Sequence, residues 1–240
     1  VGDAKTVLTK MIGFVKKNNH ENWLNEFKRL EIYAKKIVDG QPKKLGITQQ
    51  EVISMISDKT NGEAIIVADV GQNQMFSARY YQYKNPNSYI TSGGLGTMGF
   101  ALPASMGAKI AAPDKQVIAI IGDGGFQMTI QELGTIFQEK LAIKILILNN
   151  EYLGMVRQWQ EMFFEKRYSF THLVNPDFIA ISKGYGIPAK LVTEKKELEN
   201  AVDKFLSDEG PNLLEVRVEK ENNIFPMIPS GAAVDEIRIE

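Results

Sequence analysis

Runs of apolar residues alternate with amphipathic stretches along most of the chain. Apolar residues at helical spacing predict helices over residues 100–111, 130–139 and 196–206. Five apolar runs are typical of buried strands: residues 64–69, 116–121, 142–148, 189–192 and 213–218. This alternation predicts the α/β fold class, with a doubly wound, mainly parallel sheet and helices on both faces. Ligands of such sheets bind at the carboxyl ends of the strands, near the point where the strand order reverses.

Local signals add further helices. Thr48 and Glu51 form a capping box that begins one helix. Asn175-Pro176-Asp177 predicts another helix start, with the proline just inside the helix. Residues 85–91 make a poor strand because they are polar and rich in turn formers.

The first forty residues have a helical periodicity of their own. Their apolar positions predict helices over residues 4–17 and 23–37. The run Gly40-Gln41-Pro42-Lys43-Lys44 is a break typical of a linker. We therefore expect a helical segment joined to the larger α/β part.

Composition excludes several classes of function. The chain has 240 residues, enough for one large α/β domain and an appendage. A net charge of -1 argues against nucleic-acid or membrane-surface partners, and no apolar run approaches the ~18 residues that span a bilayer. The chain contains no cysteine, which excludes disulfides and thiolate chemistry and suits a cytoplasmic location. The N-terminus is neither a signal peptide nor an initiator methionine, so we expect part of a longer polypeptide.

Polar motifs directly follow two of the predicted strands. Gly122-Asp123-Gly124 follows the strand at 116–121, and Asn149-Asn150 follows the strand at 142–148. If these strands are parallel, the Asp123 carboxylate and the Asn150 amide leave the same edge of the sheet. Such oxygen ligands suit Mg²⁺, which keeps open positions for phosphate oxygens. Each motif alone is typical of a helix cap or a turn, but together they favour a metal-bound diphosphate.

Two more loops are rich in amides or glycine. Residues 69–74 contain Gly71, which allows close backbone approach, and amides that can donate to phosphate oxygens; a polar turn explains them equally well. Residues 92–99 hold four glycines, which suit contact with a flat ring or an anion, and also tight helix–sheet packing. Gly94, Gly96 and Gly99 match the dinucleotide fingerprint GxGxxG, but that fingerprint requires a preceding strand, which residues 85–91 do not predict.

The helix expected after Asn150 has an apolar face formed by Met155, Val156 and Trp159. Such a face is typical of core packing, and its closeness to Asn150 also suits the wall of a substrate pocket. Other chemistry-bearing residues have ordinary explanations. We expect structural or surface roles for His20 and His172, and surface or ion-paired roles for Arg157 and Arg167. The carboxylates of Asp69, Asp114 and Glu132 are typical of solvated or helix-capping groups.

Three segments resemble the C-terminal cofactor domain of the acetolactate synthase (acetohydroxyacid synthase) catalytic subunit. They are SGGLGTMGFALPASMGA at 92–108, GDGGFQMTIQELGT at 122–135 and NNEYLGMVRQWQEMFFEKRYS at 149–169. The ending NIFPMIPSGAAVDEI is similar too, and the run from Met155 to Gln160 is the most specific part. The resemblance implies that residues 1–44 are the helical tail of a preceding central domain with its linker. Residues 45–240 would form a thiamine-diphosphate- and Mg²⁺-binding domain.

The resemblance also implies residue roles. Asp123 and Asn150 would bind Mg²⁺ through their side chains, and Tyr152 through its backbone carbonyl. Trp159, with Met155 and Val156, would shape the pocket for the second 2-oxo acid. The residues that would surround the cofactor are Val70, Gly71, Gln72, Asn73, Gln74, Gly96, Met98, Gly122, Asp123, Gly124, Gly125, Asn150, Tyr152, Leu153, Gly154 and Met155. Two positions depart from the family, which usually has histidine in place of Asn73 and tryptophan in place of Phe76.

The implied reaction joins two 2-oxo acids with loss of CO₂. Pyruvate would combine with pyruvate or 2-oxobutyrate to give 2-acetolactate or 2-aceto-2-hydroxybutyrate, in branched-chain amino acid biosynthesis. In the family, an N-terminal domain of a partner subunit supplies the activating glutamate, and the middle domain binds FAD. The resemblance therefore implies a fragment without a catalytic residue of its own, inactive alone. The full-length subunit would form a homodimer or homotetramer and could bind a regulatory subunit.

Two other interpretations stay open. The chain could be a non-catalytic module that binds the cofactor or only contributes a dimer interface. It could also be a domain of another 2-oxo acid decarboxylase or of a pyruvate oxidase.

Overall fold

A computed structural model describes residues 1–40, 45–229 and 231–238. The chain separates into two compact units, residues 43–224 and residues 1–42 with 225–240. We call them the sheet unit and the helical unit. Most of the predicted linker at 40–44 lies outside the described residues.

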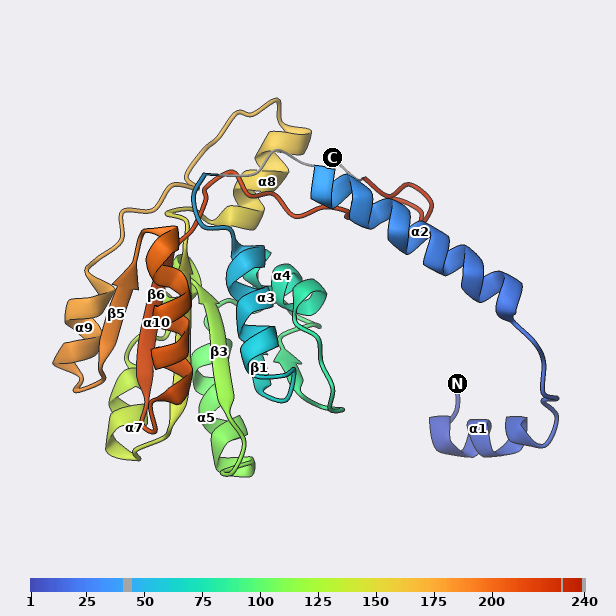
Figure 1. Ribbon diagram of the computed structural model, residues 1–240, viewed down its shortest axis with the longest axis horizontal. Coiled ribbons are helices and arrows are strands. Elements are labelled where there is room, and N and C mark those ends of the chain that lie inside the picture. The colour runs from blue at the N-terminus through green and yellow to red at the C-terminus, as the bar shows by residue number, and fades with distance from the viewer. Residues whose placement is uncertain (41–44, 230, 239–240) are drawn as a thin grey trace. The chain divides into compact units, whose positions relative to one another are not determined.

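The sheet unit is built on a six-stranded, wholly parallel sheet, ordered β2-β1-β3-β4-β6-β5 (Figure 1). The strands are β1 (Ile65–Ala68), β2 (Tyr89–Thr91), β3 (Val117–Gly122), β4 (Ile143–Asn149), β5 (Ala189–Val192) and β6 (Asn212–Arg217). This confirms the predicted fold class and all five predicted strands. The strand order reverses at β1, because the next two strands in sequence lie on opposite sides of it.

The expectation that residues 85–91 contain no strand is wrong. Tyr89–Thr91 pairs in parallel with β1, where Ile66 faces Tyr89 and Ala68 faces Thr91. β2 lies at the edge of the sheet, so it is short and needs backbone partners on one side only. A three-residue edge strand shows too little periodicity to be recognised from sequence.

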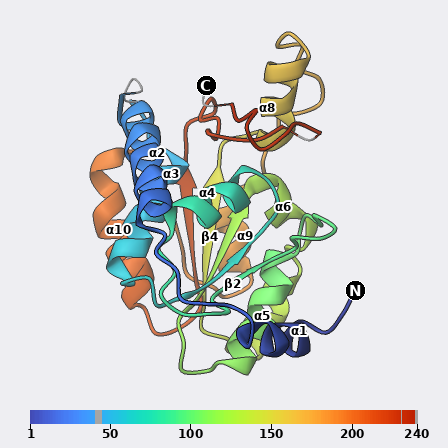
Figure 2. The same cartoon turned by 90° about the vertical axis from the view of Figure 1, so that its right-hand side faces the viewer.

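Alternate residues of each strand face two separate cores, as a parallel sheet covered on both faces requires. Ile66, Ile118 and Leu146 pack with α3 (Gln49–Lys59), α4 (Gln72–Tyr80) and α10 (Lys195–Ser207). Val67, Ala119 and Ile145 pack on the opposite face. That face is covered by α5 (Ala101–Ala111), α6 (Asp123–Met128), α7 (Glu132–Gln138) and α9 (Phe178–Gly184). Figure 2 looks onto the β2 edge and shows the two helix layers on either side.

Two predicted helix starts have different outcomes. The capping box is confirmed, since the Thr48 hydroxyl accepts from the Glu51 N–H and the Glu51 carboxylate accepts from the Thr48 N–H. The prediction that Pro176 lies inside a helix is wrong. Asp177 caps α9 by accepting a hydrogen bond from the Ala180 N–H over 2.9 Å, so the helix begins after the proline.

The helical unit contains α1 (Ala4–Ile12) and α2 (Glu21–Gly40). α1 ends at Ile12 and is therefore shorter than the predicted helix; the next residue, Gly13, is a poor helix former. Trp23 and Phe27 make an edge-to-face contact on α2, and both side chains are more than half exposed. Among the described residues, no helix combines the length and apolar character needed to cross a membrane.

Candidate functional site

The loops that follow β1, β3 and β4 meet at the carboxyl edge of the sheet, next to the point where the strand order reverses. They enclose a small cavity of about 40 Å³. Its lining residues are Gln49, Val70, Gly71, Gln72, Asn73, Met98, Gly122, Asp123, Gly124, Gly125, Leu148, Asn150, Tyr152, Leu153 and Gly154. The structure therefore brings together most of the residues that the sequence assigns to the cofactor, from these three loops and, with Met98, from the glycine loop before α5.

Five of the predicted residues do not line this cavity: Gln74, Gly96, Met155, Val156 and Trp159. Two lining residues were not expected, Gln49 on α3 and Leu148 on β4. The Leu148 position follows from the strand register. Gln49 lies on a helix distant in sequence, and no motif marks it.

Asp123 is the one carboxylic acid among the described residues that line the cavity. It is the first residue of α6 and only 1% exposed. Burial raises the pKa of this carboxyl to about 6. Smaller effects lower the pKa: the hydrogen bond from Asn175, those from the backbone N–H groups of Asp123 and Gly124, and the charge of Arg217. The carboxylate is nevertheless ionised at neutral pH, in surroundings that solvate it poorly. A bound cation would compensate this buried charge.

Asn150 and Tyr152 border the same cavity as Asp123. The Asn150 Oδ1 accepts from the Tyr152 N–H over 3.1 Å, and its Nδ2 donates to the Gln72 Oε1 over 3.4 Å. Between them Glu151 has a φ of 60°, a left-handed conformation that turns the chain sharply. Glu151 is held there by ion pairs to Arg217 and Lys220. Asp123, Asn150 and Tyr152 thus line one small cavity, and the carboxylate and amide oxygens among them are donors that suit Mg²⁺.

The three amides predicted to donate to phosphate are already engaged within the protein. Asn73 Nδ2 donates to the Ile120 carbonyl over 3.0 Å, Gln74 Nε2 to the Thr91 Oγ1 over 2.9 Å, and Gln72 Nε2 to the Gln158 Oε1 over 2.9 Å. These side chains tie the loop to β3, β2 and α8 (Gly154–Phe163). Backbone N–H groups at the start of α4 remain suited to an anion, and Gly71 at φ 129° allows the turn that aims them.

The glycine loop before α5 is organised by a buried acid. Asp69 is fully buried and accepts from the Gly99 N–H over 3.1 Å and the Ala101 N–H over 2.9 Å. Of the two roles expected for this acid, solvation and helix capping, the structure shows capping. β2 does precede the loop, so the lack of a preceding strand no longer argues against a dinucleotide site. The Asp69 carboxylate argues against it instead, because it occupies the helix N-terminus where a pyrophosphate would bind.

α8 buries a polar face. Its buried residues are Arg157 and Gln158, while Val156 is 47% exposed and Trp159 stacks at a tilt on Phe163. The Gln158 amide is satisfied by the Ile224 backbone, over 3.0 and 3.1 Å, and by Gln72. Met155 packs against the core as the apolar spacing predicts, whereas tertiary hydrogen bonds bury the polar Gln158 and leave Val156 exposed.

Arg157 is ion-paired, one of the two roles expected for it. Its guanidinium bonds Glu161 and Glu221, each over 3.1 Å, and lies 5.4 Å from the centre of the Tyr152 ring. His172 packs its ring edge-on against Tyr152. Among the described residues there is no cluster of three or more His, Cys, Asp or Glu that could bind a metal.

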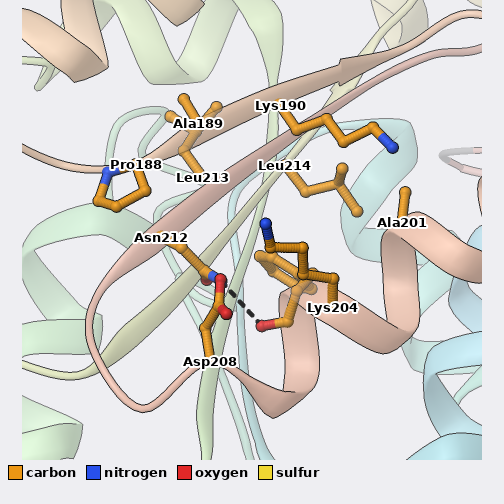
Figure 3. Close-up of a pocket in the computed structure, with 10 residues that line it drawn as sticks. Pro188, Ala189, Lys190, Ala201, Lys204, Asp208, Asn212, Leu213 and Leu214 are labelled. Carbon is orange, nitrogen blue, oxygen red and sulfur yellow. Dashed lines mark hydrogen bonds between the residues drawn. The ribbon is translucent and has the colours of Figure 1, made fainter.

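A second cavity, of about 110 Å³, lies where β5 and β6 begin, between these strands and the end of α10. Figure 3 shows Asn212 and Asp208 at its wall. The Asn212 amide donates to the Phe205 carbonyl and to the Asp208 carboxylate. None of the predicted site residues borders this cavity.

Comparisons with known proteins are consistent with this geometry. The family model "Thiamine pyrophosphate enzyme, C-terminal TPP binding domain" matches residues 69–216. The large subunit of acetolactate synthase from Lactococcus lactis is 42% identical over 239 residues, covering 99% of this chain and 41% of that protein. The mitochondrial catalytic subunit from Saccharomyces cerevisiae is 42% identical over 240 residues, covering 98% and 35%.

The fold is also found in a solved structure, a thiamine-diphosphate-dependent 4-hydroxybenzoylformate decarboxylase from Rhodococcus jostii. Its TM-score is 0.66 at 26% identity, covering 76% of this chain and 34% of that one. The chain thus spans between 34% and 41% of the relatives named here.

Proposed function

Because this chain belongs to the thiamine pyrophosphate enzymes, as their C-terminal cofactor-binding domain, we propose that it binds thiamine diphosphate through Mg²⁺. The observation that carries the proposal is the pairing of buried Asp123 with Asn150 in one cavity at the carboxyl edge of the sheet. Asp123 and Asn150 bind the cation through side-chain oxygens, and Tyr152 through its backbone carbonyl. Gly71 allows the diphosphate to approach the backbone.

When bound, the cofactor supplies the electron sink for breaking and forming carbon–carbon bonds beside a carbonyl group. The protein's part is to hold the diphosphate end, orient the rings and exclude water. Met98 from the glycine loop borders the cavity and supports the aminopyrimidine end. Trp159 and Val156 on α8 border the path of the second substrate. Both residues lie on the helix that begins four residues after Asn150.

We further propose an acetolactate synthase reaction. Two pyruvates give 2-acetolactate and CO₂, and pyruvate with 2-oxobutyrate gives 2-aceto-2-hydroxybutyrate and CO₂, as steps toward branched-chain amino acids. The support is the 42% identity to two proteins named acetolactate synthase, over nearly the whole of this chain.

The cavity supports the further proposal that this chain does not turn over substrate alone. Its volume of about 40 Å³ is far below the roughly 300–1,000 Å³ of pockets that enclose a small molecule. It accommodates the diphosphate end and leaves the rest of the cofactor to be covered by another surface. Asp123 is occupied with the cation, so the acid that activates the cofactor comes from elsewhere. We propose a partner subunit as its source, with residues 1–44 as the tail of a preceding domain and residues 45–240 as the cofactor domain.

Calorimetry tests the cofactor proposal. Thiamine diphosphate is titrated into the full native polypeptide with Mg²⁺, with EDTA, and with Mg²⁺ after Asp123→Ala. We expect binding in the first titration only. Equal heats with and without metal, or full binding by the Asp123→Ala variant, would contradict it. The exposed Asp114→Ala substitution, at the opposite end of the strands, serves as the control.

A second candidate is a simple 2-oxo acid decarboxylase, favoured by the structural likeness to the Rhodococcus enzyme. The two functions differ in product. An acetolactate synthase releases a branched hydroxy acid from pyruvate, whereas a decarboxylase releases an aldehyde. Product analysis by mass spectrometry of the full native polypeptide with pyruvate separates them.

A further inference from the structure

Asn175 lies at the centre of the hydrogen bonds around the proposed metal site, although the sequence marks it only as part of a predicted helix start. Its Nδ2 donates to the Asp123 Oδ2 over 2.7 Å and to the Asn149 Oδ1 over 3.1 Å. Its Oδ1 accepts from the Gln127 Nε2 over 2.8 Å. One half-buried amide thus joins both ends of α6, at Asp123 and Gln127, to the end of β4 at Asn149.

Asn149, which accepts a hydrogen bond from Asn175, is itself held by several partners. It is 1% exposed, and its Nδ2 donates to the Glu215 carboxylate over 2.6 Å. Its Oδ1 accepts from the Glu151 N–H over 3.0 Å as well as from Asn175. The two asparagines of the Asn-Asn motif therefore differ in role, because Asn150 borders the cavity and Asn149 anchors the residues around it.

The backbone places Asn175 at this point. The segment 171–175 runs beside residues 151–153, where the Leu153 N–H donates to the Thr171 carbonyl and the Leu173 N–H donates to the Glu151 carbonyl, each over 2.8 Å. The Leu173 side chain covers Gly124, where an added Cβ would lie 3.2 Å from its Cδ1. These backbone hydrogen bonds hold the segment that leads to Asn175 against the loop that follows Asn150.

We propose that Asn175 is a positioning residue for the Mg²⁺ site, which holds the Asp123 carboxylate in the orientation that binds the cation. This inference rests on the proposed function. An oriented carboxylate loses little rotational freedom when the cation binds, and partners of metal ligands typically contribute 10–100-fold to metal affinity. The amide can fill this role because it donates to the carboxylate without adding a competing charge.

The test compares Asn175→Ala with Asn212→Ala in the full native polypeptide. Asn212 is a matched control, because its amide also makes two hydrogen bonds but lies at the second cavity, away from the proposed metal site (Figure 3). Thiamine diphosphate binding is followed by circular dichroism as a function of Mg²⁺ concentration. We expect Asn175→Ala to raise the half-saturating Mg²⁺ concentration about 10–100-fold, while saturating Mg²⁺ restores full cofactor affinity. Asn212→Ala leaves the half-saturating concentration unchanged.

An unchanged half-saturating concentration in Asn175→Ala would overturn the proposal. A cofactor affinity that stays low at saturating Mg²⁺ would also overturn it, since that result indicates a general structural role. If Asn175→Ala does not fold, Gln127→Ala tests the proposal in its place, because Gln127 is exposed and donates a hydrogen bond to the Asn175 Oδ1. We expect it to shift the Mg²⁺ dependence in the same direction by a smaller factor, and no shift would refute the proposal. Failure of the proposed function is distinguishable, because Asp123→Ala would then retain the wild-type Mg²⁺ dependence.

Discussion

The carboxylate of Asp69 accepts a hydrogen bond from the Ala101 N–H over 2.9 Å, inside the sheet unit. Asp69 directly follows β1, and Ala101 is the first residue of α5, so this bond links the strand to a helix that covers one face of the sheet. The same carboxylate accepts from the Gly99 N–H and thereby sets the path of the glycine loop.

Asp69→Asn should lower the free energy of unfolding by about 3 kcal/mol. The amide keeps one acceptor oxygen, but its NH₂ group then faces a backbone N–H, and one charge-assisted hydrogen bond is lost in a buried place. Urea unfolding followed by circular dichroism measures the change. Asp114→Asn is the control, because Asp114 is exposed and its replacement should stay within about 0.5 kcal/mol. Equal stabilities for the two variants would contradict the role assigned to Asp69.

Without cofactor, the raised pKa of Asp123 should make stability fall as pH rises. The carboxyl has a pKa of about 6 when folded against an ordinary value of 3.8, so the folded state binds the proton more tightly between these values. Across that window the free energy of unfolding should decrease by about 3 kcal/mol from this group. Asp123→Asn should remove this decrease and stabilise the cofactor-free protein at pH 7.

The same variant should lose Mg²⁺-dependent protection. In the wild type, saturating thiamine diphosphate with Mg²⁺ should raise Tm, because a ligand that binds only the folded state stabilises it. Asp123→Asn should show no such rise. Thermal unfolding with and without the two ligands checks both expectations, and a variant still protected by them would rule out Asp123 as a ligand of the cation.

Gly154→Ala should weaken cofactor binding about tenfold. A Cβ at this position would overlap the Gln72 Oε1 and lie 2.8 Å from the Asn150 Nδ2, so both amides must move. Gly107→Ala is the matched control, since no atom lies within 4 Å of the added Cβ and alanine stabilises a helix interior by about 0.5–1 kcal/mol. Calorimetric affinities should therefore separate the two variants, and similar affinities would contradict the close contact at Gly154.

Trp159→Leu should change the ratio of the two products when pyruvate and 2-oxobutyrate compete. The Trp159 ring is partly exposed, and its centre lies 4.9 Å from the centre of the Phe163 ring. Its replacement therefore removes a large side chain from the proposed substrate pocket without creating a cavity in the hydrophobic core. Discrimination of one methylene is worth about 1–3 kcal/mol, so we expect a change of about tenfold in the ratio. Trp23→Leu, at the other tryptophan, should leave the ratio unchanged. An unaltered ratio in Trp159→Leu would remove this residue from the pocket.

Several elements were predictable because their signals are local. The strands β3 and β4 are continuous apolar runs, and each is followed at once by a polar motif, which placed Asp123 and Asn150 at one edge. The Thr48 capping box depends on residues three apart. β2 escaped prediction because an edge strand of three residues carries little periodicity, and α9 began later than expected because Asp177 is the better cap.

The sequence by itself determined the alternation of strands and helices and the loops that carry the cofactor motifs, since each depends on neighbours within a few residues. The parallel arrangement of the strands follows from that alternation, because helices connect successive strands. Only the tertiary structure decided that Asn175 meets Asp123, that Gln72 and Gln158 share a hydrogen bond, and that α8 buries its polar face. These partners lie 52 and 86 residues apart. Their meeting depends on strand order and register, and hydrogen bonds made after folding compensate the burial of polar groups that periodicity alone would place in water.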